Sequence, residues 1–377
     1  MSVQHYLSRR KASPLTLWKK VNDLGDIIDF FKNTHKNITT NMKIIRTPKN
    51  KFAWIVTGLF QSDGYFSLII KKNKTSKFGI DVSLILGINL TLASLPLLQQ
   101  VQVYFGCGKI SIDKTRKMCL FSITELSSLW HVVLPHFMLY PFFGDKQVSF
   151  IRFVQILTLL YPYNKKFKPA LLLGKVIYLG YFLNPGSNRT TTEFKNLFKI
   201  LNLDIEIVIN SINQEHLNNI TKYFKQNNTL INIYFIIGVI EGDGSFYVGL
   251  RTNRKVRFGF NITTHIYELD LLYKIKWSLN CGNTKIKSDN WCRYEVEGSK
   301  ILRNLFIPIV DSIGLLGSKA NNFETFKEAM NIFTKKEHLT DEGLRKLAEI
   351  VYNNTSKKGI GRKYTLEQYL QINNLST

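Results

Sequence analysis

One short pattern occurs twice in this chain, at residues 52–64 and again at residues 232–244. Each copy is an apolar run that carries a glycine in its middle, Gly58 or Gly238, and ends in Asp-Gly. A run of this length makes about three turns of α-helix. Glycine inside a helix costs roughly 1 kcal/mol relative to alanine, which is explained if another backbone must come very close there. The pattern therefore predicts two helices that pack on each other through these glycines.

Each copy also places an aspartate, Asp63 or Asp243, at the C-terminal end of its predicted helix. The next residue, Gly64 or Gly244, is expected to end the helix in the left-handed conformation. A helix dipole is negative at this end, so two aspartates brought together by helix pairing repel each other unless a cation lies between them. The arrangement predicts a divalent metal site, for which Mg²⁺ suits carboxylate ligands. The alternative is that each aspartate only caps its own turn.

The charge of the chain indicates a polyanionic partner. Its 377 residues include 51 Lys and Arg against 27 Asp and Glu, a formal net charge of +24. Such an excess favours binding to nucleic acid or to an anionic membrane surface. No run of about 18 apolar residues occurs, which argues against a membrane-spanning helix. The four cysteines form no CxxC pair, and we interpret them as small core residues rather than zinc ligands.

The chain repeats as a whole around the two motifs. After each Asp-Gly, alternating apolar and polar residues at 78–84 and 256–263 predict strands with one buried face. Helical segments at 95–105 and 269–279 follow, and then a second hairpin in each copy. Because internal repeats decide architecture, we expect an N-terminal extension at 1–50, a first repeat at 51–200, a linker at 201–230 and a second repeat at 231–377. The basic start of the extension predicts either an import presequence or an arm on nucleic acid.

Residues 56–64 and 236–244 resemble the LAGLIDADG motif of homing endonucleases. The glycine at the third position and the final Asp-Gly match in both copies, and the usually acidic sixth position is Gln61 in the first and Glu241 in the second. The resemblance implies an α+β fold of two pseudo-symmetric αββαββα repeats, packed through the motif helices into a saddle-shaped DNA-binding surface. It also implies a monomeric, intron-encoded enzyme of mitochondria or another organelle, which cuts double-stranded DNA with Mg²⁺.

The resemblance assigns the metal site to Asp63 and Asp243, with the backbone carbonyls of Ser62 and Gly242 as further ligands. The family often has a polar strand residue near the metals as well. The alignment places Leu90 and Thr264 at that position. Leucine has no polar group, so one half-site is expected to be slower.

Two lysines in matching contexts, Lys146 and Lys319, complete the catalytic set that the resemblance implies. They follow Gly-Asp in the first repeat and Gly-Ser in the second. Their expected place is near the scissile phosphates, where they would stabilise charge or orient the attacking water. The alternative is that both are ordinary solvated lysines.

Basic residues gather in the predicted hairpins, which form the DNA-reading surface in this interpretation. Arg and Lys hydrogen-bond guanine edges in the major groove, and that groove admits a two-stranded ribbon. The candidates are Lys71, Lys72, Lys74, Lys77, Lys114, Arg116, Arg251, Arg254, Lys255, Arg257, Lys285 and Lys287. For any single residue, a phosphate contact or solvation is the alternative.

Two other functions fit the same charge. An intron maturase would bind RNA and assist splicing, alone or as a second activity. A structural component of an organellar nucleoprotein particle would also be basic. Both leave the paired aspartates without a task, so the sequence favours the nuclease.

Overall fold

The computed structural model describes residues 51–164, 166–184, 191–225, 231–251, 254–353 and 364–375. The predicted N-terminal extension, residues 1–50, lies outside the described residues, so its role as presequence or arm stays a prediction. Within the described ranges, no helix has the length and apolar character needed to cross a bilayer.

The first repeat begins with the motif helix and continues as two hairpins separated by a helix. In chain order these elements are α5 (Lys51–Ser62), β1 (Gly64–Lys72), β2 (Ile80–Thr91), α6 (Leu95–Phe105), β3 (Lys109–Asp113) and β4 (Met118–Ile123). The helices that follow include α8 (Leu134–Leu139), α9 (Gly144–Leu160), α10 (Ala170–Tyr181) and α11 (Thr191–Leu201). The four strands form an antiparallel sheet in the order β1-β2-β4-β3.

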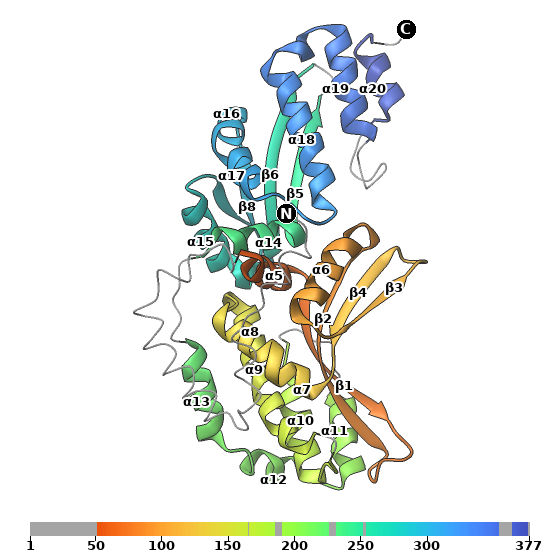
Figure 1. Ribbon diagram of the computed structural model, residues 1–377, viewed down its shortest axis with the longest axis vertical. Helices are drawn as coiled ribbons and strands as arrows, with labels where there is room; N and C mark the ends of the chain where they lie inside the picture. The colour runs from red at the N-terminus through yellow and green to blue at the C-terminus, as the bar shows by residue number, and fades with distance from the viewer. Residues whose placement is uncertain are drawn as a thin grey trace.

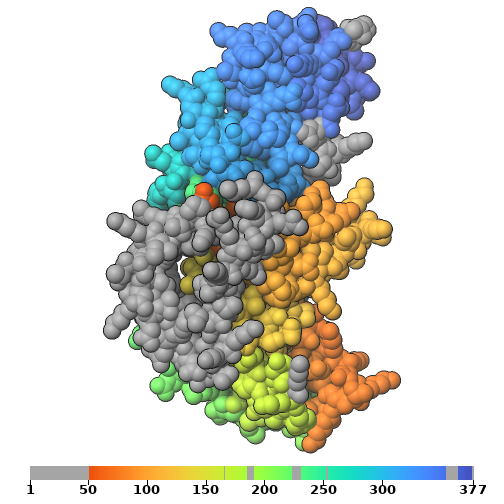
Figure 2. All heavy atoms as spheres, viewed as in Figure 1, coloured from red at the N-terminus to blue at the C-terminus, as the bar shows by residue number. Residues whose placement is uncertain are grey.

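The second repeat has the same order of elements. They are α14 (Ile233–Asp243), β5 (Gly244–Leu250), β6 (Val256–His265), α15 (Leu269–Leu279), β7 (Asn283–Ser288), β8 (Trp291–Glu297), α17 (Ile307–Ile313), α18 (Lys319–Thr334), α19 (Asp341–Asn353) and α20 (Leu366–Ile372). Its sheet runs β5-β6-β8-β7. Helices α5 and α14 lie together at the middle of the molecule, with one repeat on either side (Figure 1). In the space-filling view the hairpins of the first sheet, in orange, project from one edge (Figure 2).

The alternating segments form strands because one of their faces is apolar. Val82 and Leu84 of β2 are buried in the first core, and Phe258 and Phe260 of β6 are buried in the second. Helices α6 and α15 have the bounds expected for residues 95–105 and 269–279. The four cysteines are free, and those at equivalent places, Cys119 and Cys292, are buried. The period of the sequence thus places the elements correctly.

Helices α5 and α14 pack through their glycines. A Cβ atom on Gly58 would lie 3.0 Å from the Cα of Gly238 and would collide with the carbonyl of Phe235. A Cβ on Gly238 would lie 2.8 Å from the Cα of Gly58. Neither separation leaves room for a side chain, so glycine is required on both helices for this approach.

The predicted left-handed cap at Gly64 and Gly244 is wrong. Gly244 is extended, with φ −65° and ψ 140°, and Gly64 is absent from the glycines of positive φ. Each glycine is the first residue of a strand. A Cβ there would lie 2.5 Å from the carbonyl oxygen of Phe60 or Ile240, one turn back in the helix. Each strand starts directly against the last helical turn, so there is no space for a side chain at this position. Glycine is needed for that reason and not for its ability to adopt a positive φ.

The predicted linker begins as two helices that rest on the first repeat. They are α12 (Ile205–Asn210) and α13 (Gln214–Lys225). Val208 and Ile220 belong to the first hydrophobic core, and Lys175 of α10 donates a 2.6 Å hydrogen bond to the Ser211 carbonyl. This part of 201–230 therefore extends the first core, while the domain limits drawn from the sequence stay a prediction.

Candidate active site

Asp63 and Asp243 lie at adjacent helix ends. Asp243 is the last residue of α14, and the Asp63 amide donates to the Leu59 carbonyl at 3.1 Å, which continues the turns of α5. The two ends touch across the helix pair. A Cβ on Gly242 would lie 2.7 Å from Asp63 Oδ2, and the Ser62 side chain hydrogen-bonds Asp243. Helix pairing therefore brings together the two aspartates that the motifs place far apart in the sequence.

The surroundings of the aspartates disfavour two negative charges. Burial raises the pKa of Asp63, against the effect of the nearby lysines Lys319 and Lys146. Burial and the charge of Asp63 raise the pKa of Asp243 to about 6, and the same two lysines oppose that shift. Two partly desolvated carboxylates at two negative helix ends are a place where an additional cation lowers the free energy.

Lys146 and Lys319 occupy equivalent positions beside the aspartates. Lys146 Nζ donates to the Gly64 carbonyl at 2.5 Å, and Lys319 Nζ donates to the Gly244 carbonyl at 2.6 Å. Both residues are half-buried. Burial lowers the pKa of Lys146, while the neighbouring carboxylates, first that of Glu268, raise it. These contacts fix each ammonium group next to the residue that follows an aspartate.

The sixth motif positions, Gln61 and Glu241, anchor the loops that carry these lysines. Gln61 exchanges two hydrogen bonds with the backbone of Phe143, at 3.0 and 3.1 Å. Glu241 Oε1 accepts from the amides of Leu316 and Gly317, the latter at 2.9 Å. The glutamine serves the same anchoring purpose as the glutamate because its amide supplies both a donor and an acceptor.

Glu268 joins the two repeats at the site, and the sequence analysis missed it. Its Oε1 accepts from the Lys146 amide at 3.3 Å, and its Oε2 accepts from Gln61 Nε2 at 3.4 Å. Burial raises the pKa of Glu268 to about 7. At the equivalent place in the first repeat, Ser94 Oγ accepts from the Ser318 amide at 3.0 Å. The only sign of Glu268 in the sequence is that a glutamate stands where the first repeat has Ser94, just before the matching helices α15 and α6.

The two repeats differ at the strand position of Leu90 and Thr264. Leu90 pairs with Cys119 and Thr264 pairs with Cys292, so the two occupy equivalent places in their sheets. Thr264 lines a small cavity with Ser62 and Asp243. Leu90 is buried in the first hydrophobic core. The two equivalent places therefore differ in polarity, and the slower half-site stays a prediction.

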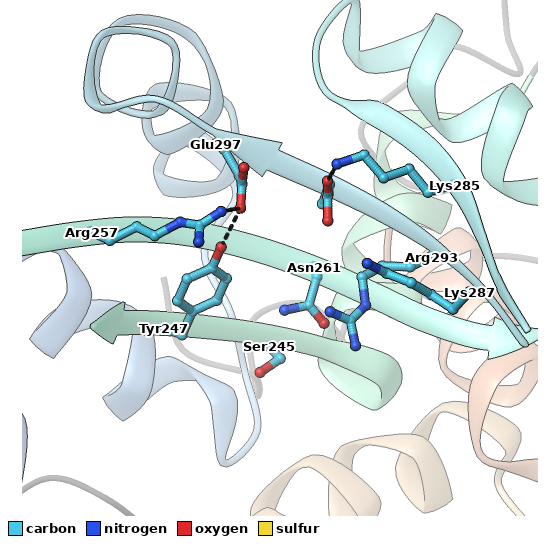
Figure 3. A pocket seen from close by; sticks show the side chains of 9 residues that line it. Ser245, Tyr247, Arg257, Asn261, Lys285, Lys287, Arg293 and Glu297 are labelled. Atoms are coloured by element: carbon cyan, nitrogen blue, oxygen red, sulfur yellow. Dashed lines mark hydrogen bonds and ion pairs between the residues drawn. The ribbon is translucent and has the colours of Figure 1, made fainter. Parts of the chain in front are cut away.

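A hollow of about 500 Å³ lies on the outward face of the second sheet, and two predicted DNA-binding residues line it as ion pairs (Figure 3). Arg257 contacts Glu297 Oε1 at 2.5 Å, and the Tyr247 hydroxyl donates to the same oxygen at 2.8 Å. Lys285 pairs with Glu295. Glu297, Glu295 and Tyr247 were missed because a search for basic residues passes over them, and the basic Arg293 of β8 was missed as well. Lys287, also predicted, lies in the same hollow.

The other predicted basic residues lie at the ends of the hairpins. Lys71, Lys72, Lys74 and Lys77 are exposed at the β1–β2 turn, Lys114 and Arg116 at the β3–β4 turn, and Arg251 and Lys255 at the β5–β6 turn.

Arg254 is the exception. Its guanidinium pairs with Asp341 at 2.7 Å and donates to the Asn373 carbonyl at 3.3 Å. Arg254 therefore ties the β5–β6 hairpin to the C-terminal helices.

The sequence profile of the LAGLIDADG endonuclease family matches the chain twice, over residues 56–157 and 236–330. The two matches contain both motifs and both sheets, and they cover more than half of the chain. The chain belongs to the LAGLIDADG endonuclease family. The family predicted from the motif residues is confirmed.

Curated relatives of this LAGLIDADG endonuclease come from fungi. It is 27% identical to a "Probable intron-encoded endonuclease 2" of Neurospora crassa over 329 residues, 84% of this chain and 67% of the relative. It is 23% identical to a "Probable intron-encoded endonuclease 3" of the same fungus over 303 residues, 78% of this chain and 53% of the relative. An "Uncharacterized 50.9 kDa protein in ND4 intron 1" of Podospora anserina is 32% identical over 129 residues, 33% of this chain and 28% of the relative. The chain thus spans about half to two thirds of the length of the two Neurospora relatives.

Solved structures share the architecture of this LAGLIDADG endonuclease. I-SmaMI bound to an uncleaved DNA target in the presence of calcium ions has a TM-score of 0.66 and 22% identity, covering 79% of this chain and 97% of that one. The LAGLIDADG meganuclease I-CpaMI bound to uncleaved DNA has a TM-score of 0.67 and 25% identity, covering 81% and 99%. The predicted α+β fold of two repeats is confirmed. The predicted class, a DNA endonuclease, is confirmed with the family, and the maturase alternative gains no support from these relatives.

Proposed function

We propose that this LAGLIDADG endonuclease cuts both strands of a long, asymmetric DNA duplex and that Asp63 and Asp243 each serve one strand. The observation that carries the proposal is the paired arrangement at the helix ends, where each aspartate is followed by a glycine whose carbonyl holds a lysine. A chain with two such sets can attack two strands as a monomer. Two non-identical repeats make the target asymmetric.

We also propose that Asp63 and Asp243 hold a divalent cation, Mg²⁺ in the cell, together with the carbonyls of Ser62 and Gly242. Two desolvated carboxylates with raised pKa values suit a hard cation with oxygen ligands. Over the residues that the structure describes, no three His, Cys, Asp or Glu side chains gather as a metal site. The remaining ligands would therefore be backbone, phosphate and water oxygens. When bound, such a cation neutralises phosphate charge and activates water.

Lys146 and Lys319 supply positive charge that belongs to the chain itself. Each ammonium is held by a backbone carbonyl and lies beside the aspartates. In that place it attracts a phosphate and stabilises the negative charge that develops on it. Burial keeps the effective dielectric low, which strengthens this interaction.

We place the protein in mitochondria as the product of an intron. The name of the Podospora relative, which refers to an ND4 intron, supports this proposal. The basic residues before Asp23 fit an import presequence as well as an arm on nucleic acid.

The decisive test is cleavage of a randomised duplex library in Mg²⁺, followed by sequencing of the cut ends. We expect a single site to be recovered, with a cut in each of its two strands. Binding of that site is then measured against random DNA and against RNA of the same sequence at ~150 mM salt. A-form RNA has a major groove too deep and narrow for a hairpin, so preference for the DNA duplex is expected. Tighter binding to a structured intron RNA, with no cut DNA, would favour the maturase.

A further inference from the structure

The outward faces of the two sheets differ in chemistry. On the second sheet the hollow of Figure 3 combines three kinds of side chain: cations, carboxylates and neutral hydrogen-bonding groups. Arg257 and Lys285 are the cations already paired, and Glu297 and Glu295 are their partners. Cations and carboxylates alternate here over three neighbouring strands.

The middle of the matching face of the first sheet carries mainly apolar and hydroxyl groups. Ile69, Ile85 and Leu120 point outward, because their neighbours Leu68, Leu84, Leu86, Cys119 and Phe121 on the same strands are buried in the core. Ile69 is 37% exposed. Serine stands opposite each of the three across the strand pairs, where Ser83 pairs with Ile69, Ser67 with Ile85 and Ser111 with Leu120. Ionisable side chains lie at the margins of this face, where Lys71 stands opposite Asp81 at the hairpin end and the edge strand β3 carries Lys109 and Asp113.

Bases offer matching chemistry in the major groove. Arginine and lysine bond O6 and N7 of guanine, a carboxylate accepts from the N4 amino group of cytosine, and apolar side chains contact the thymine methyl group. This inference rests on the proposed function. We propose that the second sheet reads guanine–cytosine pairs through its Arg–Glu and Lys–Glu pairs. We propose equally that the first sheet reads thymine methyls through its isoleucine and leucine side chains.

The geometry of Glu297 favours a reading role over a simple surface ion pair. A carboxylate facing DNA is repelled by the phosphates, and an exposed ion pair contributes little stability. Arg257 and Tyr247 both bond Oε1. Oε2 accepts no hydrogen bond from any residue that the structure describes, so it can accept from a base. The hydrogen bond from Tyr247 and then that from Arg257 lower the pKa of Glu297, which keeps it an acceptor at neutral pH.

The test is selection of bound sites from a randomised duplex library, in Ca²⁺, by the wild type, Glu297→Gln, Ile69→Ser and Glu349→Gln. Glu349 lies exposed on α19, outside the sheets, and its variant matches the charge change of Glu297→Gln. The wild type should select one half-site rich in guanine–cytosine pairs and one rich in thymine. In Glu297→Gln, the preference for cytosine should fall by about tenfold at one or two positions of the half-site rich in guanine–cytosine pairs. Ile69→Ser should lose thymine preference at one position of the other half-site.

Each contrary outcome points to a different error. If Glu297→Gln tightens binding to all sequences equally and changes no preference, the carboxylate only masks Arg257 and the inference is overturned. If both wild-type half-sites have the same base composition, the contrast between the sheets does not govern recognition. If no sequence is enriched and no DNA is cut in Mg²⁺, the proposed function itself fails. Thermal melting of each variant shows whether a loss of binding reflects unfolding.

Discussion

At the scale of single residues, Asp63 and Asp243 oppose folding as long as no cation neutralises them. Both carboxylates are desolvated, and each lies in the field of the other. A ligand that binds only the folded state raises its stability in proportion to the logarithm of ligand concentration. The aspartates are therefore the point where metal binding and stability meet.

Calcium should stabilise the wild type and should not stabilise the variant that carries both Asp63→Asn and Asp243→Asn. The measurement is the melting temperature in EDTA and at increasing Ca²⁺. Asp289→Asn, an exposed residue of the β7–β8 turn, makes the same chemical change elsewhere and should keep the wild-type response. An equal rise in all three proteins would show that the cation binds outside the paired aspartates.

Glu268 should make the stability of the metal-free protein depend on pH. The ordinary pKa of 4.5 rises to about 7 in the folded chain, chiefly through burial. Between these values the folded state holds a proton that the unfolded state has released, so stability falls as the pH rises. Glu268→Gln lacks this loss. Between pH 4.5 and pH 7, the free energy of unfolding of the wild type should therefore fall by up to about 3 kcal/mol more than that of Glu268→Gln.

Urea unfolding at several pH values in EDTA measures this difference. Glu349→Gln, on an exposed helix face, is the control and should follow the wild type. Parallel curves for wild type and Glu268→Gln would mean that the carboxyl titrates normally in the folded protein.

The sequence predicts residues whose role follows from local pattern, and it misses those whose role is tertiary. Asp63 and Asp243 stand out because a repeated motif marks them. Glu268 makes its contacts with the other repeat, to Lys146 and Gln61, more than 100 residues away. No local period or motif marks such a residue. The same holds for Glu297, which becomes a candidate only when β8 places it beside Arg257.

At the scale of elements, the α5–α14 pair depends on the absence of side chains at its crossing. Gly238→Leu should lower the melting temperature by several degrees, because it drives a side chain into the α5 backbone at a cost of about 1–3 kcal/mol or more. Gly249→Leu on β5 is the matched control, since the atoms nearest to a Cβ there lie 3.8 Å away. Equal melting temperatures for wild type and Gly238→Leu would contradict this packing.

The period of apolar residues predicts the elements well and their junctions poorly. Helices α6 and α15 have the expected bounds because a single buried face and a turn residue define each end. The junction at Gly244 was misjudged, because Asp-Gly fits both a left-handed cap and a direct passage into a strand. Only the packing of β5 against the carbonyl of Ile240 separates the two.

At the scale of the whole molecule, the net charge of +24 should govern affinity through salt. If the hairpin ends neutralise about eight phosphates, the slope of log K against log salt should be near −7, from roughly −0.9 per phosphate. The measurement is binding of the recovered site in Ca²⁺ at several salt concentrations. A slope near zero would show that the exposed lysines and arginines do not contact the DNA backbone.

The repeat predicts the two-domain plan because each copy carries its own hairpins and helices. It does not predict what is added to that plan. Helices α12 and α13 stand between the two repeats, and only the structure shows that Val208 and Ile220 rest on the first core. Arg254 likewise fits a DNA-contacting hairpin until Asp341 of α19 is seen beside it.

The central claim, that one aspartate serves each strand, is tested most directly by mapping cut ends on both strands of the recovered site in Mg²⁺. The wild type should cut both strands. Asp63→Asn and Asp243→Asn should each cut one strand at most, and the variant with both substitutions should cut neither while still binding the site in Ca²⁺. If that variant cuts both strands at the wild-type rate, the aspartates are not the catalytic centre.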